Sequence, residues 1–222
     1  MKIYGIVGAG GFGREVMPLA EHWLNIFHAY EGDSELVFVV ENEYPIPQKI
    51  VNGHRVLTMD EFLSAKASER HFNIAIGNSK VRERIANSIP ADLATPFSII
   101  APNHVSLYGN IVGEGAILCG FTQITSNAKI GRFFHGNIYS YVAHDCVIGD
   151  FVTFAPGVMC NGHVVVEDHA YIGTGVVIKD GTDKPVVIGR GAVVGMGAVV
   201  TKSVPPGATV VGNPARPLIR VP

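Results

Sequence analysis

Charged side chains are scarce in this chain. Asp, Glu, Lys and Arg make up 16% of the 222 residues, against a usual share of about 25%. A composition that is 47% hydrophobic requires either a large core or extensive burial of surface between subunits. The 17 basic and 19 acidic residues give a formal net charge of −2. Nucleic acid is therefore not expected as a partner, because no excess of positive charge is available for phosphates.

Long apolar runs and a disulfide framework are also missing. The most valine-rich stretch, "VVIGRGAVVGMGAVV", is interrupted by Arg190 and by glycines, so no segment reaches the roughly 18 apolar residues of a membrane helix. The opening "MKIYGIVGAGG" is interpreted as a buried first strand, too short for a signal peptide. Cys119, Cys146 and Cys160 show no CxxC spacing and cannot all pair. We therefore predict a cytoplasmic protein with buried thiols and no membrane partner.

The first hundred residues alternate between strand and helix patterns. Thr58 precedes Glu61 by three residues, which is the capping-box pattern of a helix start. Pro18 is expected in an early turn of the first helix, where its cost is smaller than in the interior. Apolar runs predict strands at 2–7, 36–40, 72–76 and 97–100. Apolar residues at helical spacing predict helices at 14–24 and 79–88. This alternation is typical of a small, mostly parallel α/β sheet.

From Val112 the hydrophobic period changes to six. An apolar residue recurs at every sixth position as far as Ile178, and Gly136 is the one exception. After a step of ten, the pattern resumes at Ile188 and continues to Val200. This period fits neither a helix nor a simple strand, but it is typical of a hexapeptide β-helix, in which three short strands form one eighteen-residue coil. The extra residues fall in "KDGTDKP", which is expected to be a loop at a corner.

Four stretches carry a resemblance to a known family: "GAGGFGREV", "AIGNSKVRERI", "HDCVIGDFVTFAPGVMCNG" and "VVGNPARPL". With the repeats, they resemble the bacterial hexapeptide-repeat sugar acetyltransferases, which include nucleotide-4-amino-sugar N-acetyltransferases and sialic acid O-acetyltransferase-like proteins. The resemblance covers nearly the whole chain. It implies a Rossmann-like sugar-nucleotide-binding domain at 1–102 and a left-handed β-helix acetyltransferase domain at 103–222. It also implies acetyl-CoA as co-substrate and no metal. We further predict a homotrimer, because this chain has too little charge to cover the flat apolar sides of such a β-helix, and threefold packing would bury them.

The pair His144 and Asp145 is the candidate catalytic centre. Gly162 lies eighteen residues after His144, which places it one coil away. An imidazole has a reference pKa of about 6.5 and suits proton transfer, and a neighbouring carboxylate can hold its tautomer. The resemblance implies that His144 is the general base, that Asp145 orients it and that the Gly162 amide holds the thioester carbonyl. The alternative interpretation is that His144 and Asp145 only cap a turn on a solvent-exposed face. His163 and His169 are interpreted as turn residues.

The resemblance also implies where acetyl-CoA binds. The co-substrate would lie along the later coils, with its thioester near Gly162 and its adenine near the "GNPARP" tail. Many relatives have a second histidine in the place of Thr153, which can donate a hydrogen bond but does not titrate. The residues expected to bind the cofactor are Thr153, Gly162, Thr174, Gly195 and Gly197.

The stretch "GAGGFG" forms a glycine loop of the GxGxxG type through Gly8, Gly10 and Gly13. Between a strand and a helix, this pattern is typical of diphosphate binding, and by itself it would suggest NAD with Glu41 on the ribose. Tight packing of strand against helix is the structural alternative. In the family the loop receives the nucleotide portion of the substrate. The substrate-binding residues expected are Gly10, Gly11, Phe12, Gly13, Arg14, Glu41, Asn42, Gly77 and Asn78.

The first functional hypothesis is acetyl transfer from acetyl-CoA to the amine of a nucleotide-linked 4-amino-4,6-dideoxy sugar, in bacterial surface glycan biosynthesis. O-acetylation of a sugar hydroxyl is the near alternative, because many relatives differ at Phe12, Glu41 and Asn42. A metal-dependent hydratase on the same β-helix would need three histidines that converge between subunits. His135, His144 and His163 do not match that spacing, and bound zinc would favour this alternative. A sugar-nucleotide sensor without catalysis is the last alternative, favoured by failure to bind acetyl-CoA.

Overall fold

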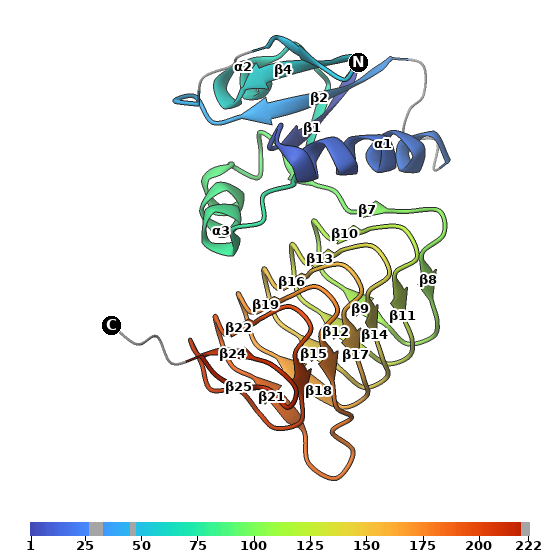
Figure 1. The fold of residues 1–222 in the computed structure, drawn as a ribbon. Helices are drawn as coiled ribbons and strands as arrows, with labels where there is room; N and C mark the ends of the chain where they lie inside the picture. The colour runs from blue at the N-terminus through green and yellow to red at the C-terminus, as the bar shows by residue number, and fades with distance from the viewer. Residues whose placement is uncertain (27–32, 45–47, 219–222) are drawn as a thin grey trace. The chain divides into compact units, whose positions relative to one another are not determined.

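The structure is a computed structural model that describes residues 1–26, 33–44 and 48–218. The chain divides into two compact units, Met1–Pro102 and Asn103–Pro222 (Figure 1). Each unit has its own core, and the two are considered separately below.

The first unit is built on a sheet with the strand order β3-β4-β2-β1-β5-β6. All neighbouring strands pair in parallel except β3 and β4, which confirms the predicted mostly parallel α/β sheet. The strands are β1 (Lys2–Val7), β2 (Ser34–Val40), β3 (Ile50–Val51), β4 (His54–Thr58), β5 (Glu69–Ile74), β6 (Thr95–Pro96) and, beyond this sheet, β7 (Ile99–Ile100).

Three helices accompany this sheet in the described residues: α1 (Gly11–Ile26), α2 (Met59–Ser64) and α3 (Ser79–Ser88). Gly5 of β1 lies against Phe62 of α2, whereas its neighbour Tyr4 contacts Phe97, which in turn contacts Trp23 of α1. Because successive strand residues face opposite sides of a sheet, α1 and α2 cover opposite faces.

The predicted capping box at the start of α2 is present. The Thr58 hydroxyl accepts a hydrogen bond from the Glu61 amide at 3.2 Å, and the Glu61 carboxylate accepts one from the Thr58 amide at 2.8 Å. These two reciprocal bonds satisfy backbone donors that a helix start leaves without partners, so a six-residue helix can begin sharply at this point.

Three local predictions need correction. Helix α1 begins at Gly11, inside the glycine motif, so Pro18 lies in the helix interior and not in an early turn. Strand β5 begins at Glu69 and ends at Ile74, two residues before the end of the predicted strand. The β3–β4 hairpin was not predicted, although Asn52 and Gly53, both with positive φ, provide the Asn-Gly signal of a tight hairpin turn.

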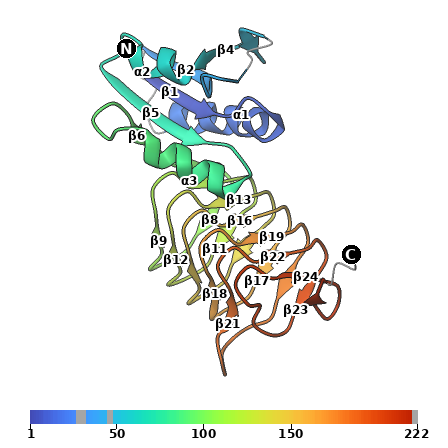
Figure 2. The ribbon, with the colours of Figure 1, turned by 90° about the vertical axis from the view of Figure 1, so that its left-hand side faces the viewer.

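The second unit is a parallel β-helix, as the period of six predicts. Its first sheet contains β10 (Ile117–Leu118), β13 (His135–Gly136), β16 (Thr153–Phe154), β19 (Tyr171–Ile172), β22 (Val193–Val194), β24 (Thr209–Val211) and the antiparallel β25 (Arg216–Pro217). The second contains β8 (Val105–Ser106), β11 (Gln123–Ile124), β14 (Tyr141–Val142), β17 (Met159–Cys160), β20 (Val177–Ile178) and β23 (Val199–Val200). The third contains β9 (Ile111–Val112), β12 (Lys129–Ile130), β15 (Val147–Ile148), β18 (Val164–Val166) and β21 (Val186–Ile188). Figure 2 shows β13, β16, β19 and β22 following one another along the coils.

The register between coils confirms the eighteen-residue repeat. Val142 pairs with Cys160, and Cys160 pairs with Ile178, each eighteen residues further along the chain. The pairs that span the predicted corner loop "KDGTDKP" have a longer separation, as in Val164 with Val186 and Tyr171 with Val193. The same register will place corner side chains directly above one another.

Gly136, the one exception in the apolar pattern, has a local explanation. A Cβ at Gly136 would lie 3.1 Å from the Phe134 ring. Phe134 is 1% exposed, and its ring meets Phe154 edge-on with centroids 5.2 Å apart. The neighbouring phenylalanine therefore fills the volume that an aliphatic side chain occupies in the other coils.

Two further sequence expectations concern cysteines and membrane helices. Cys119, Cys146 and Cys160 are free and buried, which confirms the expected buried thiols. Across the described segments, 1–26, 33–44 and 48–218, no helix combines the length and the apolar character needed to cross a membrane.

Phe154→Ala should lower the free energy of unfolding by about 3–5 kcal/mol, because it leaves a cavity in a closely packed interior. Phe154 is fully buried. Phe121→Ala is the matched control: this ring is 54% exposed and stacks on Tyr139 at a corner, so its loss should cost about 1 kcal/mol or less. Denaturant unfolding measures both values, and equal losses would contradict the assigned core.

Candidate active site

His144 and Asp145 lie at the corner that joins β14 to β15. The two side chains are in contact, with His144 Nδ1 2.8 Å from Asp145 Oδ2. Asp145 has a φ of 57°, a left-handed turn conformation that Asn and Asp adopt more readily than most residues. Both side chains are close to half exposed, so the pair is accessible to a substrate.

Gly162 lies one coil above His144, as the repeat predicts. A Cβ at Gly162 would lie 2.5 Å from His144 Cε1, 2.7 Å from His144 Nε2 and 2.7 Å from Asp180 Oδ2. Only a residue without a side chain therefore leaves room for these two groups. The Gly162 amide also forms no hydrogen bond with any described residue, so its N–H is available to a ligand.

A second column of side chains supports Asp145 at the same corner. His163 lies one coil above Asp145, and its Nε2 is 3.7 Å from Asp145 Oδ2. The rings of His144 and His163 are perpendicular, with centroids 5.0 Å apart. Asn127, one coil below, is among the groups that lower the pKa of the Asp145 carboxyl. Asp145 therefore has polar neighbours in the coil below, in the coil above and in His144 beside it.

The charges at this corner favour a protonated histidine. The hydrogen bond to Asp145 raises the pKa of His144, and the same contact lowers the pKa of Asp145. Hydrogen bonds from Thr182 lower the pKa of Asp180. Within the part of the chain that the structure describes, neither carboxylate forms an ion pair with a lysine or arginine. At neutral pH two negative carboxylates thus lie close to His144.

Three of these residues could also hold a divalent cation. Ligand atoms of His144, His163 and Asp180 lie within 4.8 Å of one another, and two imidazoles with one carboxylate form a set that suits zinc. His135, the third histidine weighed for a metal-dependent hydratase, is 1% exposed and lies in β13 of the first sheet. It does not join this group.

The other expected cofactor residues lie elsewhere on the β-helix. Thr153 is buried in β16 of the first sheet. Thr174, Gly195 and Gly197 lie at the corner between the first and second sheets, where the Gly197 amide donates to the Thr174 carbonyl at 2.8 Å. The second sheet separates this corner from His144. Of the five, only Gly162 contacts the His144 side chain.

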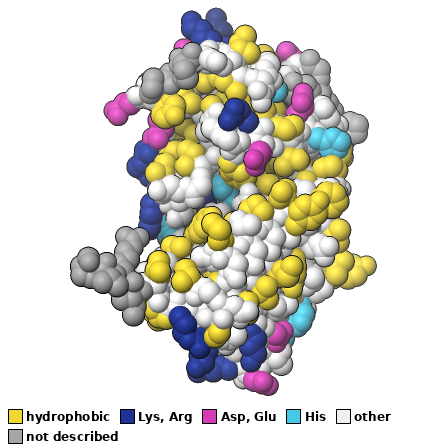
Figure 3. Space-filling model, in the orientation of Figure 1, with side chains coloured by type: hydrophobic (Ala, Val, Ile, Leu, Met, Phe, Trp, Pro, Cys, Tyr) yellow, Lys and Arg dark blue, Asp and Glu magenta, His cyan; other side chains and the backbone are white. Residues whose placement is uncertain are grey.

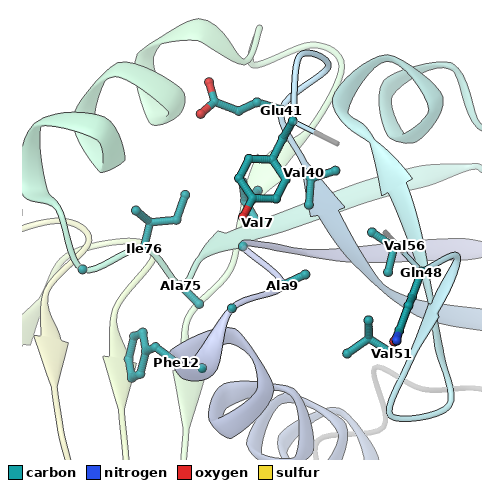
Figure 4. Close-up of a pocket in the computed structure, with 15 residues that line it drawn as sticks. Val7, Ala9, Phe12, Val40, Glu41, Gln48, Val51, Val56, Ala75 and Ile76 are labelled. Atoms are coloured by element: carbon teal, nitrogen blue, oxygen red, sulfur yellow. The ribbon is translucent and has the colours of Figure 1, made fainter. Parts of the chain in front are cut away.

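The first unit contains a pocket of about 510 Å³ at the carboxyl ends of β1, β2 and β5. Phe12 and Ile76 line one side, and Gln48, Val51 and Val56 line the other (Figure 4). Of the predicted substrate residues, Gly10, Gly11, Phe12, Glu41 and Gly77 line this pocket. The carboxyl end of a parallel sheet is the usual place for a ligand in such folds.

The glycines of the loop have two different roles. A Cβ at Gly13 would lie 1.9 Å from the Gly8 carbonyl oxygen, so Gly13 allows α1 to pack closely against the end of β1. A Cβ at Gly10 or Gly11 would meet no atom within 4 Å, because both border the open pocket. Packing therefore explains Gly13 but not Gly10 or Gly11.

Three of the predicted substrate residues make structural contacts, including Glu41 of the pocket lining. Both Glu41 carboxylate oxygens bind the Arg84 guanidinium, at 2.7 and 3.0 Å. The Asn42 side chain accepts from the Asp60 amide, and the Asn78 side chain caps α3 by accepting from two amides of its first turn. Arg14 is exposed and is not among the residues that line the pocket.

Buried Arg82 fixes the loop that carries Gly77. Its guanidinium donates to the carbonyls of Ile76 and Gly77, at 2.7 and 3.3 Å. Burial lowers the pKa of Arg82 to about 9, which still leaves the side chain cationic at neutral pH. The sequence did not predict the role of several residues at this pocket, because they belong to no recognisable motif. They are Arg82, Tyr44, Gln48 and the valines of the pocket wall.

Comparison with known proteins identifies the family. Residues 4–89 match the model of the PglD N-terminal domain. A GDP-perosamine N-acetyltransferase of Escherichia coli O157:H7 is 52% identical over 223 aligned residues, which cover 100% of this chain and 99% of the relative. This chain belongs to the hexapeptide-repeat sugar acetyltransferases.

Solved structures of similar proteins extend over both units of this acetyltransferase. WeeI from Acinetobacter baumannii AYE is 52% identical and superposes with a TM-score of 0.91, covering 98% of this chain and 100% of that one. The acetyltransferase domain of PglB from Neisseria gonorrhoeae, in complex with acetyl coenzyme A, is 28% identical with a TM-score of 0.82. It covers 97% of this chain and 98% of its own. The predicted fold class, with its left-handed β-helix, is confirmed.

At this corner, the sequence analysis missed Asp180 and interpreted His163 only as a turn residue. His163 lies eighteen residues after Asp145, and Asp180 lies eighteen residues after Gly162. The spacing that led from His144 to Gly162 therefore also leads to both of them. His163 does occupy a turn, with a φ of 57°, but its ring also contacts the ring of His144.

Asp145→Asn should lower the pKa of His144, because the hydrogen bond to Asp145 is the largest cause that raises it. In an NMR titration of the ring protons, the His144 midpoint should move to lower pH. Asp183→Asn removes an exposed carboxylate from the neighbouring loop and should leave the midpoint in place. An unchanged midpoint in the Asp145 variant would mean that the 2.8 Å contact does not persist in solution.

Proposed function

We propose that this chain transfers the acetyl group of acetyl-CoA to the amine of a nucleotide-linked 4-amino-4,6-dideoxy sugar. GDP-perosamine is the first acceptor to test, because the full-length relative from Escherichia coli is named for that substrate. The structural observation that carries the proposal is the His144–Asp145 pair beside Gly162, whose amide has no hydrogen-bond partner among the described residues.

In this proposal His144 is the general base. With Nδ1–H donating to Asp145, Nε2 carries the lone pair that can accept a proton, and Nε2 faces the space beside Gly162. The acceptor amine attacks the thioester carbonyl carbon as His144 takes its proton. The Gly162 N–H can donate to the carbonyl oxygen as negative charge develops on it. His144 then returns the proton to the departing CoA thiolate.

The pocket of the first unit supports binding of the nucleotide portion. Gly10 and Gly11 leave the backbone at the start of α1 open to the pocket, and the first amides of a helix suit a diphosphate. The apolar wall formed by Val51 and Val56 suits a nucleobase. Glu41 is already paired with Arg84, so it contributes less to ligand recognition than its position after β2 suggested.

The enzyme is further proposed to be a homotrimer. Large apolar side chains remain exposed on the described coils, including Tyr108 at 90%, Ile111 at 62% and Met196 at 81%. Figure 3 shows hydrophobic patches on one face of these coils. Threefold packing would bury part of this exposed apolar surface. The acetyl acceptor and acetyl-CoA are expected to be cytoplasmic metabolites, so the cytoplasm remains the predicted location.

The trimer has a direct test. Light scattering at micromolar concentration should give about three times the 23.7 kDa chain mass. Ile111→Glu, which places a charge on the exposed apolar surface, should shift the mass toward that of one chain. A single-chain mass for the unmodified protein would contradict the proposal.

The function is tested by thiol release from acetyl-CoA with GDP-perosamine and His144→Asn. Loss of a general base should lower kcat by roughly 10²–10⁴-fold, with little change in KM for acetyl-CoA, because the imidazole acts mainly in the transition state. Raising the pH should restore part of the rate with an amine, which loses its own proton, and almost none with a hydroxyl acceptor. His22→Asn, in an exposed part of α1, is the control. Normal turnover by His144→Asn near neutral pH would exclude His144 as base.

A further inference from the structure

Asp180 is held with one carboxylate oxygen fixed and the other presented to the site. Its Oδ1 accepts hydrogen bonds from the Thr182 amide, at 2.7 Å, and from the Thr182 hydroxyl. Its Oδ2 faces the space above Gly162. Two bonds to one oxygen fix the orientation of the carboxylate, so Oδ2 is preorganised for a ligand.

Asp180 Oδ2 and His144 Nε2 face the same small space. Both atoms lie 2.7 Å from the point that a Gly162 Cβ would occupy, and ligand atoms of the two residues approach within 4.8 Å. A nitrogen atom between them could lie within hydrogen-bond distance of both. A primary amine has enough hydrogens for two such bonds, whereas a hydroxyl has one.

The charge of the site also favours a cation. Asp145 and Asp180 are both carboxylates, and among the described residues no lysine or arginine neutralises either one. A sugar amine is protonated in neutral solution, so it brings a positive charge to these two carboxylates. A hydroxyl brings no charge, so it would gain less from the Asp180 carboxylate than an ammonium ion does.

We propose that Asp180 binds the acceptor amine as its ammonium ion, and that this contact makes the site select an amine over a hydroxyl. The inference rests on the proposed function and adds the residue that determines its acceptor class. Asp180 holds the nitrogen beside His144 Nε2, where the thioester carbonyl carbon would be attacked.

The protons balance in this scheme. The bound ammonium first releases one proton to solvent, which leaves a neutral amine between Asp180 and His144. The amine forms the C–N bond to the acetyl carbon while a second proton passes to His144 Nε2. The C–S bond breaks, and the CoA thiolate takes that proton from His144. The products are the amide, CoA thiol and one proton in solution.

The test compares Asp180→Asn with the unmodified enzyme, using GDP-perosamine and its analogue with a 4-hydroxyl in place of the amine. At neutral pH the substitution should raise KM for GDP-perosamine about tenfold or more, because a charge-assisted hydrogen bond is lost. KM for acetyl-CoA should stay within about twofold. The inhibition constant of the neutral hydroxyl analogue should not change. The difference in KM should shrink at high pH, where the amine is neutral.

Asp183→Asn is the matched control, because it removes the same charge from the same loop at an exposed position. It should leave all constants unchanged. An unchanged KM for GDP-perosamine in Asp180→Asn would overturn the inference, and so would an equal loss of affinity for the hydroxyl analogue, which would indicate a general loop distortion. Melting temperatures identify a variant that fails to fold, and Asp180→Ser, which keeps a polar side chain without charge, then replaces it.

A metal ion at the same corner would give a different result. Assays with a chelator test for it: activity that disappears with chelator and returns with zinc would overturn the inference, because His144, His163 and Asp180 would then hold a metal. An unmodified enzyme that neither binds nor acetylates nucleotide-linked amino sugars would overturn the proposed function itself. An active enzyme whose amine preference survives Asp180→Asn would overturn only the role of Asp180.

Discussion

The stacking of apolar side chains inside the β-helix is the constraint on which the site depends. Each coil must present its sixth-residue side chains to the interior, and hydrogen bonds between coils hold residues eighteen apart in register. Corner residues are then stacked as strictly as the core residues are. His144, Gly162 and Asp180 form one column at a corner, and Asn127, Asp145 and His163 form the next.

The two columns have different roles at the site: one orients His144, and the other provides space and polar groups for a ligand. Asp145 lies among two histidines and an asparagine, so it can hold the His144 tautomer without leaving its turn. The same contact raises the pKa of His144. A stronger base results, although a smaller fraction of it is neutral at acidic pH. Gly162 lies between His144 and Asp180, and because it has no side chain there is room for both of these groups. Its amide has no hydrogen-bond partner among the described residues and can donate to a ligand.

In the first unit, two arginines of α3 fix the loops of the pocket but are not among the residues that line it. Arg84 binds Glu41 after β2, and Arg82 binds the carbonyls that follow β5. The two loops at the carboxyl ends of the sheet are therefore both tied to α3. Gly10 and Gly11 stay open at the start of α1, while Gly13 brings that helix against β1. The loops of the pocket are thus anchored before any ligand binds.

The sequence by itself determined the features that repeat or follow a local rule. The period of six predicted the β-helix, its eighteen-residue coil and the Gly162 position, and the capping box predicted α2. The sequence was less accurate about boundaries and packing. It placed the start of α1 three residues too late, and it did not show that Phe134 fills the space beside Gly136. Only the tertiary structure decided that Glu41 pairs with Arg84, that His135 is buried, and that Asp180 turns one oxygen toward His144. These outcomes depend on side-chain directions and on partners far along the chain, which periodicity does not encode.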